Sequence, residues 1–175
     1  PMEIHGGTFT RTQSGQVLGS YGNVTIDSAV SGPVFNREGG TADAIVNVKF
    51  GKMKFNGGSI KVSDGSDRAA LRADGTTYEY TSKTEINGGK IIGAKYGIRV
   101  RNGKPDVILK DVQFENNDTD IYLNANQKIT IEETFKNNAT VGCADPKDGR
   151  QLTKATETGY QEKLNLTSAD EGYLV

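Results

Sequence analysis

The sequence predicts an all-β solenoid, a parallel β-helix, from three observations. The first is a repeat: Ile98 and Val100 in YGIRVRNG return as Ile121 and Leu123 in DIYLNAN, 23 residues later. The second is that apolar residues alternate at every second position, as in a strand with one buried face. The third is that turn residues such as NGKP, NND and NAN separate these runs. A fixed period of this size indicates coils that bury their apolar faces by stacking on each other.

A second alternating series has the same spacing. Val107 and Leu109 in DVILKD precede Ile129 and Ile131 in KITIEE by 22 residues. No stretch has the i, i+3, i+4, i+7 pattern of an amphipathic helix, and the L-x-x-L-x-L spacing of leucine-rich repeats is absent. We therefore expect each coil to contribute two or three short strands. Each strand should pair with its counterpart one coil later, about 4.8 Å away.

A glycine pair marks one corner of the coil. The form h-x-h-x-G-G-x-h, where h is apolar, predicts a tight corner because glycine reaches positive φ without a Cβ clash. It occurs at residues 2–9, 53–60 and 84–91, with a weaker copy at 24–30 and a copy without glycines at 107–114. Equivalent corner positions are then 7, 29, 58, 89 and 112. The uneven intervals predict two loop insertions, near Asn36–Asp43 and Ser63–Lys83, expected as surface loops that either carry function or are tolerated length variation.

The C-terminal part shows no further copy of the 22- to 23-residue repeat. After Glu133 we expect the register to be lost, which divides the chain into a β-helix at 1–133 and a β-rich C-terminal cap, or the start of a next module, at 134–175. A solenoid needs such a cover because its last coil would expose strand edges and apolar core. Leu164 and Leu166 would supply apolar faces. Both chain ends are strand-like, so we interpret the chain as a piece of a longer protein.

Composition narrows the function classes. The 175 residues carry a net charge of −1, which favours neither a nucleic-acid partner nor an anionic membrane. No apolar run reaches 18 residues and no signal-peptide pattern opens the sequence, so we expect neither membrane insertion nor a signal peptide within this segment. The lone Cys143 has no partner for an internal disulfide, and its VGCADP context is typical of a loop with an inert thiol. We expect a monomer without cofactor or bound metal.

GGKIIGAKYGIRVRNG followed by DVILKDVQFENNDTDIYLNANQKITI resembles the GGTISGN-type repeats of large cell-surface proteins of gut and oral Firmicutes. The closing TVGCADPKDGR…TGYQEKLNLTSADEGYLV is similar to the segment that ends those arrays. The resemblance spans most of the chain and implies a right-handed parallel β-helix that is exported, adhesin-like and anchored to the cell wall through other parts of its protein. Two departures, the missing glycines at Asp111-Val112 and the long Ser63–Lys83 segment, leave any ligand open.

Catalytic arrangements known on β-helices were tested against the sequence. Polygalacturonase-like sites need clustered aspartates with histidine and arginine, but His5 is the only histidine. The Asn117–Asp120 run lies between strands, where such residues serve turns. A calcium-dependent lyase needs aligned carboxylates and an arginine base. The candidates for it are not aligned by the strand register: Asp106, Asp111, Asp118 and Asp120, with Arg99 and Arg101.

The outward positions give the candidate binding residues. If Ile98 and Val100 face inward, Arg99 and Arg101 face out. Tyr122 and Asn124 occupy the same columns one coil later, and Arg72 and Asp74 one coil earlier. The expected columns are therefore Arg72–Arg99–Tyr122 and Asp74–Arg101–Asn124.

Arginine and tyrosine are enriched at binding hot spots and can form cation–π pairs. The alternative is ordinary cross-strand pairing on a solvated sheet. Tyr78 and Tyr80 in the neighbouring insertion complete the expected site.

These patterns lead to three hypotheses. The first is a non-catalytic binding module of a bacterial surface protein, extracellular, whose partner is a host protein such as immunoglobulin or mucin, or a host glycan. The second is a fragment of a carbohydrate-active β-helix enzyme of polysaccharide lyase or glycosidase type. The third is a structural spacer on the cell surface. The two insertions and the Arg/Tyr column favour the first.

Overall fold

A computed structural model describes most of the chain. The described residues are 1–27, 32–48, 50–63, 68–75, 81–132, 134–145, 151–154 and 164–166. Within these ranges the regular structure consists of strands, and no helix able to cross a membrane is found.

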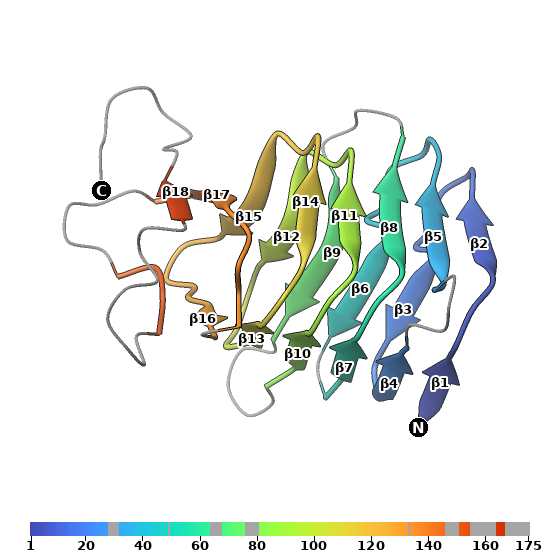
Figure 1. Ribbon diagram of the computed structural model, residues 1–175, viewed down its shortest axis with the longest axis horizontal. Helices are drawn as coiled ribbons and strands as arrows, with labels where there is room; N and C mark the ends of the chain where they lie inside the picture. The colour runs from blue at the N-terminus through green and yellow to red at the C-terminus, as the bar shows by residue number, and fades with distance from the viewer. Residues whose placement is uncertain are drawn as a thin grey trace.

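The strands form three parallel sheets that wind into one solenoid (Figure 1). Successive coils follow one another along the long axis of the molecule, from β1 at one end towards β17 and β18 at the other (Figure 1). Sheet A, in order, is β1 (Met2–Ile4), β4 (Asn23–Ile26), β7 (Lys52–Phe55), β10 (Lys83–Ile86), β13 (Asp106–Leu109) and β16 (Thr130–Ile131). Sheet B is β2 (Thr8–Arg11), β5 (Val34–Arg37), β8 (Ser59–Val62), β11 (Lys90–Ile92) and β14 (Gln113–Glu115). Sheet C is β3 (Leu18–Ser20), β6 (Ile45–Val48), β9 (Ala69–Asp74), β12 (Tyr96–Val100), β15 (Thr119–Leu123), β17 (Ala139–Cys143) and β18 (Leu164–Leu166).

The strand register confirms the predicted parallel β-helix. Ile98 pairs with Ile121 and Val100 with Leu123, both in parallel. The second repeat series pairs in the same way in sheet A, where Leu109 lies beside Ile131. The repeat in the sequence therefore corresponds to one coil of the solenoid.

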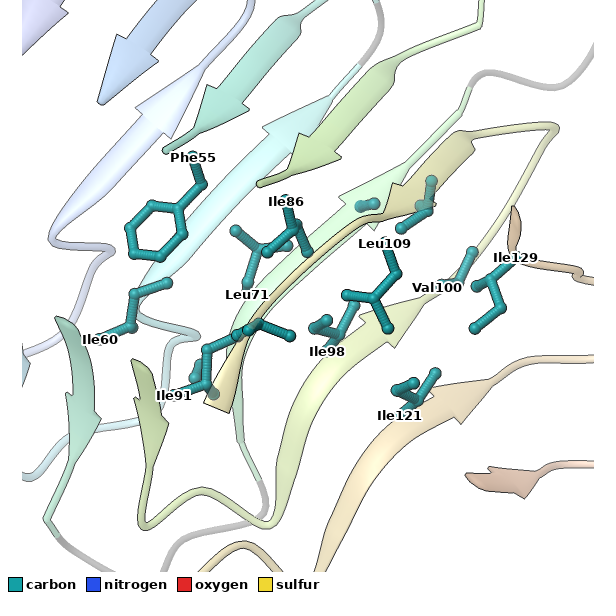
Figure 2. Packing of buried hydrophobic residues seen from close by; sticks show 14 of the residues in the cluster. Phe55, Ile60, Leu71, Ile86, Ile91, Ile98, Val100, Leu109, Ile121 and Ile129 are labelled. Atoms are coloured by element: carbon teal, nitrogen blue, oxygen red, sulfur yellow. The ribbon is translucent and has the colours of Figure 1, made fainter. Parts of the chain in front are cut away.

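The core consists of apolar ladders that run along the solenoid. Figure 2 shows Phe55, Ile86 and Leu109 of sheet A pointing into the same interior as Ile60 and Ile91 of sheet B. Leu71, Ile98 and Ile121 of sheet C close this interior from the third side (Figure 2). These side chains are almost completely buried. Burial of each is worth about 1.5–3 kcal/mol, so the ladders are the main source of stability.

The glycine pairs form corners between sheets A and B, as predicted. Gly7, Gly58 and Gly89 have φ values of +101°, +92° and +94°. At Gly58 a Cβ would lie 2.3 Å from the carbonyl oxygen of Pro33. Glycine is required there both for its backbone conformation and for the close approach of the neighbouring coil.

The first predicted insertion is misplaced. The register aligns Thr8 with Val34 and Val34 with Ser59, so the equivalent of Gly7 in the second coil is Pro33 and not residue 29. The extra residues lie at 27–33, before β5, and residue 29 itself falls outside the described residues.

Asn36 and Arg37 belong to β5 rather than to a loop at Asn36–Asp43. The remainder of that segment lies in the corner 38–44, which connects β5 to β6. The first coil has its equivalent corner at 12–17, between β2 and β3. The strand was not recognised in the sequence because one of its inward-facing residues is the fully buried Arg37, a charged residue at a position where an apolar one is expected. Its guanidinium donates to the carbonyl oxygens of Arg11 at 2.8 Å and Ala42 at 3.0 Å.

The second predicted insertion, Ser63–Lys83, is not one surface loop. It contains β9, whose Ala69, Ala70, Leu71 and Ala73 are all completely buried. The strand was missed because alanine is a poor strand former and its small side chains gave no alternation of apolar bulk. β9 ends at Asp74, and the predicted insertion also includes Lys83, the first residue of β10.

The expected loss of register after Glu133 is wrong. β17 pairs in parallel with β15, with Val141 beside Ile121 and Cys143 beside Leu123. The predicted boundary between 1–133 and 134–175 therefore does not coincide with an end of the parallel pairing, which continues through β18. Cys143 lies in a strand and is buried in the core, not in a loop.

Candidate binding face on sheet C

Sheet C presents the predicted arginine and tyrosine column on its outer side. Arg99 pairs with Arg72 of the preceding coil and with Tyr122 of the following coil. Their chain neighbours, such as Ile98 and Val100, are buried in the core. The column lies on a hydrogen-bonded backbone, so the positions of its three Cα atoms are fixed by the fold.

The second predicted column is Asp74–Arg101–Asn124. Its Arg101 and Asn124 directly follow the last residues of β12 and β15. The amide of Arg101 donates to the carbonyl of Ala73 at 3.0 Å, and that of Asn124 to the carbonyl of Val100 at 2.9 Å. Asp74, Arg101 and Asn124 thus follow the same register as the first column, as predicted from the sequence.

Tyr96, at the start of β12, joins this face although alternation assigns it to the interior. Gly97 and Ile98 are both buried, so alternation is broken at Gly97 and Tyr96 is displaced outward. A Cβ at Gly97 would lie 2.6 Å from the carbonyl oxygen of Asp120, which explains the glycine. The Tyr-Gly dipeptide at the start of the strand is the signal that could have identified Tyr96.

Tyr96, Arg99 and Tyr122 form one contact unit, here called the tyrosine–arginine cluster. The two ring centroids are 4.4 Å apart, with the ring planes tilted by 39°. The guanidinium carbon of Arg99 lies 5.0 Å from the Tyr96 centroid and 5.6 Å from that of Tyr122. Each cation–π contact at a partly exposed position contributes about 0.5–1 kcal/mol. The rings therefore hold the guanidinium in a defined position.

Arg72 is neutralised by two carboxylates. It forms a charged hydrogen bond with Asp43, and its Nε lies 3.1 Å from Asp74 Oδ2. Asp43 also accepts a hydrogen bond from the amide of Ala69 at 2.9 Å, which links the corner 38–44 to β9. With side chains only 20%, 8% and 17% exposed, Arg72, Asp43 and Asp74 compensate one another within the sheet and present little charged surface.

The other two arginines have weaker charge partners. Arg101 Nε lies 3.8 Å from Asp74 Oδ1, a long ion pair. Arg99 Nε donates to Asn124 Oδ1 at 3.4 Å, and no carboxylate among the described residues forms an ion pair with it. Within the part of the chain that the structure describes, the contacts of the Arg99 guanidinium are therefore with aromatic rings and one amide and not with a carboxylate.

The phenol of Tyr122 stays protonated at neutral pH. Burial raises its pKa above the ordinary value, the neighbouring Tyr96 raises it further, and the positive charge of Arg99 lowers it. A neutral phenol beside a cation can donate a hydrogen bond to an incoming acceptor.

Tyr78 and Tyr80, the remaining predicted binding residues, lie outside the described residues.

The aspartate run tested as a catalytic motif has a structural role. Asn117 donates to the carbonyl of Ile91 at 3.1 Å and accepts from the amide of Ala94 at 3.0 Å. Asp120 accepts hydrogen bonds from the amide and the hydroxyl of Thr140. These contacts join neighbouring coils, those of Asn117 at the corner before β15 and those of Asp120 within β15. Among the described residues, no group of three or more His, Cys, Asp or Glu side chains is placed to hold a metal ion.

Comparison of the chain with protein-family models, with curated proteins and with solved structures gives no match. The resemblance to GGTISGN-type surface proteins therefore stays a prediction.

Proposed function

We propose that this chain is a non-catalytic binding module of a bacterial cell-surface, adhesin-like protein, which recognises a host protein such as mucin or immunoglobulin, or a host glycan. The tyrosine–arginine cluster on the outer side of sheet C is the observation that carries this proposal. Arginine and tyrosine are the residue types enriched where truncation costs the most binding energy.

The solenoid supplies what such a site needs. The parallel ladders fix Arg99 and Tyr122 on adjacent strands, about 4.8 Å apart, before any ligand arrives. The packing of Tyr96, Arg99 and Tyr122 on one another restricts their rotamers in advance. A side chain that is already ordered loses less conformational entropy on binding, so more of its contact energy appears as affinity.

The enzyme hypothesis has less support from these contacts. Asn117 and Asp120, the centre of the aspartate run, are engaged in hydrogen bonds between coils. The exposed His5 lies 3.4 Å from Glu3 and 3.7 Å from Asp27, at the N-terminal end of sheet A and far along the solenoid from the cluster. A spacer stays the main alternative, since it would need no specific side chains at all.

The test is a binding screen against mucin, immunoglobulin and a glycan array, followed by single substitutions. Arg99→Ala and Tyr122→Ala should each weaken binding by about 2 kcal/mol, roughly thirtyfold. Lys54→Ala on sheet A is the matched control and should bind like the unmodified protein.

Two other outcomes would replace the proposal. If nothing in the screen or in whole mucosal secretions binds, the spacer is favoured. If polygalacturonate or a similar polymer is cleaved, and cleavage is lost in Asp118→Asn or Asp120→Asn proteins that still fold, the enzyme is favoured.

A further inference from the structure

The positive charges of sheet C are unequally compensated. Arg72 has two carboxylate partners and Arg101 has one at longer range. Arg99, next to Arg72 in the column, has no ion-pair partner among the described residues. An external carboxylate at Arg99 would remove this imbalance.

The guanidinium of Arg99 has unused hydrogen-bond donors. A guanidinium carries five N–H groups in a planar fork, and a carboxylate accepts two of them side by side. Only the Nε–H group has a partner among the described residues, the side-chain oxygen of Asn124 at 3.4 Å. The terminal nitrogens have no hydrogen-bond partner within the described ranges, so a bidentate contact, in which arginine is superior to lysine, is open to them there.

The surroundings also favour an anion. Lys95 Nζ lies 5.5 Å from the Tyr96 ring centroid, so a second cationic side chain borders the cluster. The carboxylate of Asp120 in β15 is occupied by Thr140 and by the amide of Asn117 at 3.0 Å.

The arrangement of the rings favours a protein over a sugar. Binding of a sugar ring by stacking needs an open, flat aromatic surface. Here the two rings are tilted by 39° against each other, and the ring of Tyr96 already contacts Tyr122, Arg99 and Lys95. The cluster offers a guanidinium and two phenol groups, which are hydrogen-bonding groups. Such groups suit hydrogen bonding to side chains and backbone in a protein interface.

We infer that the partner of this face is an acidic protein surface, which places an aspartate or glutamate carboxylate on the guanidinium of Arg99, beside the rings of Tyr96 and Tyr122. The inference rests on the proposed function and specifies its ligand. It predicts binding that is sensitive to salt and that is lost when the fork of Arg99 is removed.

The experiment is an NMR titration of the 15N-labelled protein with short poly-L-glutamate as the probe. We expect shifts of the Arg99 Nε–H signal and of the amides of β12 and β15, with an affinity that falls roughly tenfold or more between low and high salt. In Arg99→Gln protein these shifts should vanish, whereas Lys54→Gln on sheet A should leave them unchanged. Sialyllactose and a heparin fragment, run in parallel, offer a sugar-borne carboxylate and sulfate.

Three results would overturn the inference. They are an absence of shifts with poly-L-glutamate, equal shifts on sheets A and C, and shifts at Arg99 that only a sugar probe produces. The proposed function is judged separately. A mucin or immunoglobulin whose binding depends on Arg99 but is not displaced by poly-L-glutamate would leave the binding module standing and refute the acidic partner.

Discussion

The outer faces of sheets A and C use the same ladder geometry in different ways. On sheet A, Glu85 lies beside Lys54 of the preceding coil and 2.8 Å from Lys83 of its own strand. Opposite charges thus compensate each other from coil to coil. On sheet C, Arg99 lies beside Arg72, and aromatic rings take the place of a carboxylate at Arg99. The comparison teaches that an aligned column of side chains is not by itself a binding site. A site arises where a side chain in the column keeps hydrogen-bond donors that its neighbours do not use.

The largest expected effect on the free energy of unfolding concerns the apolar core beneath sheets A and C. Leu109→Asp should destabilise the protein by about 4 kcal/mol or more, because it removes a core side chain and buries a charge without a partner. Arg101→Ala, which removes only a long and partly exposed ion pair, should cost less than about 1 kcal/mol. Thermal and urea unfolding measure both. Equal midpoints for Leu109→Asp and the unmodified protein would show that the inward and outward assignment on both faces is wrong.

A medium effect is expected where sheet C departs from strict alternation. Gly97→Ala places a Cβ 2.6 Å from the Asp120 carbonyl oxygen and 3.2 Å from the Phe114 ring, both too close. Relief of this overlap should cost about 1–3 kcal/mol and shift Tyr96 away from Tyr122. The control is Gly19→Ala in β3, where a Cβ meets nothing closer than 4.0 Å. Unchanged ring-proton shifts of both tyrosines in folded Gly97→Ala would contradict the role of Gly97 in forming the cluster.

The smallest effect concerns Glu85 on the outer face of sheet A, whose charge is compensated by neighbouring lysines. The hydrogen bond from Lys83 lowers the pKa of Glu85, and the charges of Lys83, Lys54 and Lys110 lower it further. A lowered folded-state pKa stabilises the protein above the unfolded pKa, and this contribution is lost as the pH falls through the folded value. Glu85→Gln should therefore cost less than about 1 kcal/mol at pH 7 and nothing in strongly acidic solution. A difference that persists below pH 2 would mean that Glu85 acts through packing instead of charge.

The fold and the main column could be predicted because they depend on periodicity. In the two best coils, bulky Ile98 and Ile121 recur at one spacing with polar residues between them, and this alternation fixes both the pairing and the outward positions of Arg99 and Tyr122. Glycine pairs such as Gly88-Gly89 located the corners, because the positive φ of the second glycine is a conformation that this residue type adopts readily.

The elements that sequence reasoning missed are those that lack bulky apolar residues or a regular alternation of apolar and polar positions. Alanines concealed β9, and a shorter offset concealed β17, in which Val141 follows Ile121 by 20 residues instead of 23. The break at Gly97 concealed Tyr96. The pairing of Arg72 with Asp43 joins residues from two coils through a corner, and no local pattern in the sequence records such a contact.

The most direct test of the central claim is hydrogen-exchange mass spectrometry of the protein with whichever of mucin or immunoglobulin binds it in the screen. Peptides that cover β12 and β15 should become protected on binding, because the partner would lie over the tyrosine–arginine cluster. Peptides that cover β10 and β13 of sheet A should exchange as in the free protein. Protection of sheet A with no change on sheet C would contradict the assignment of the binding face.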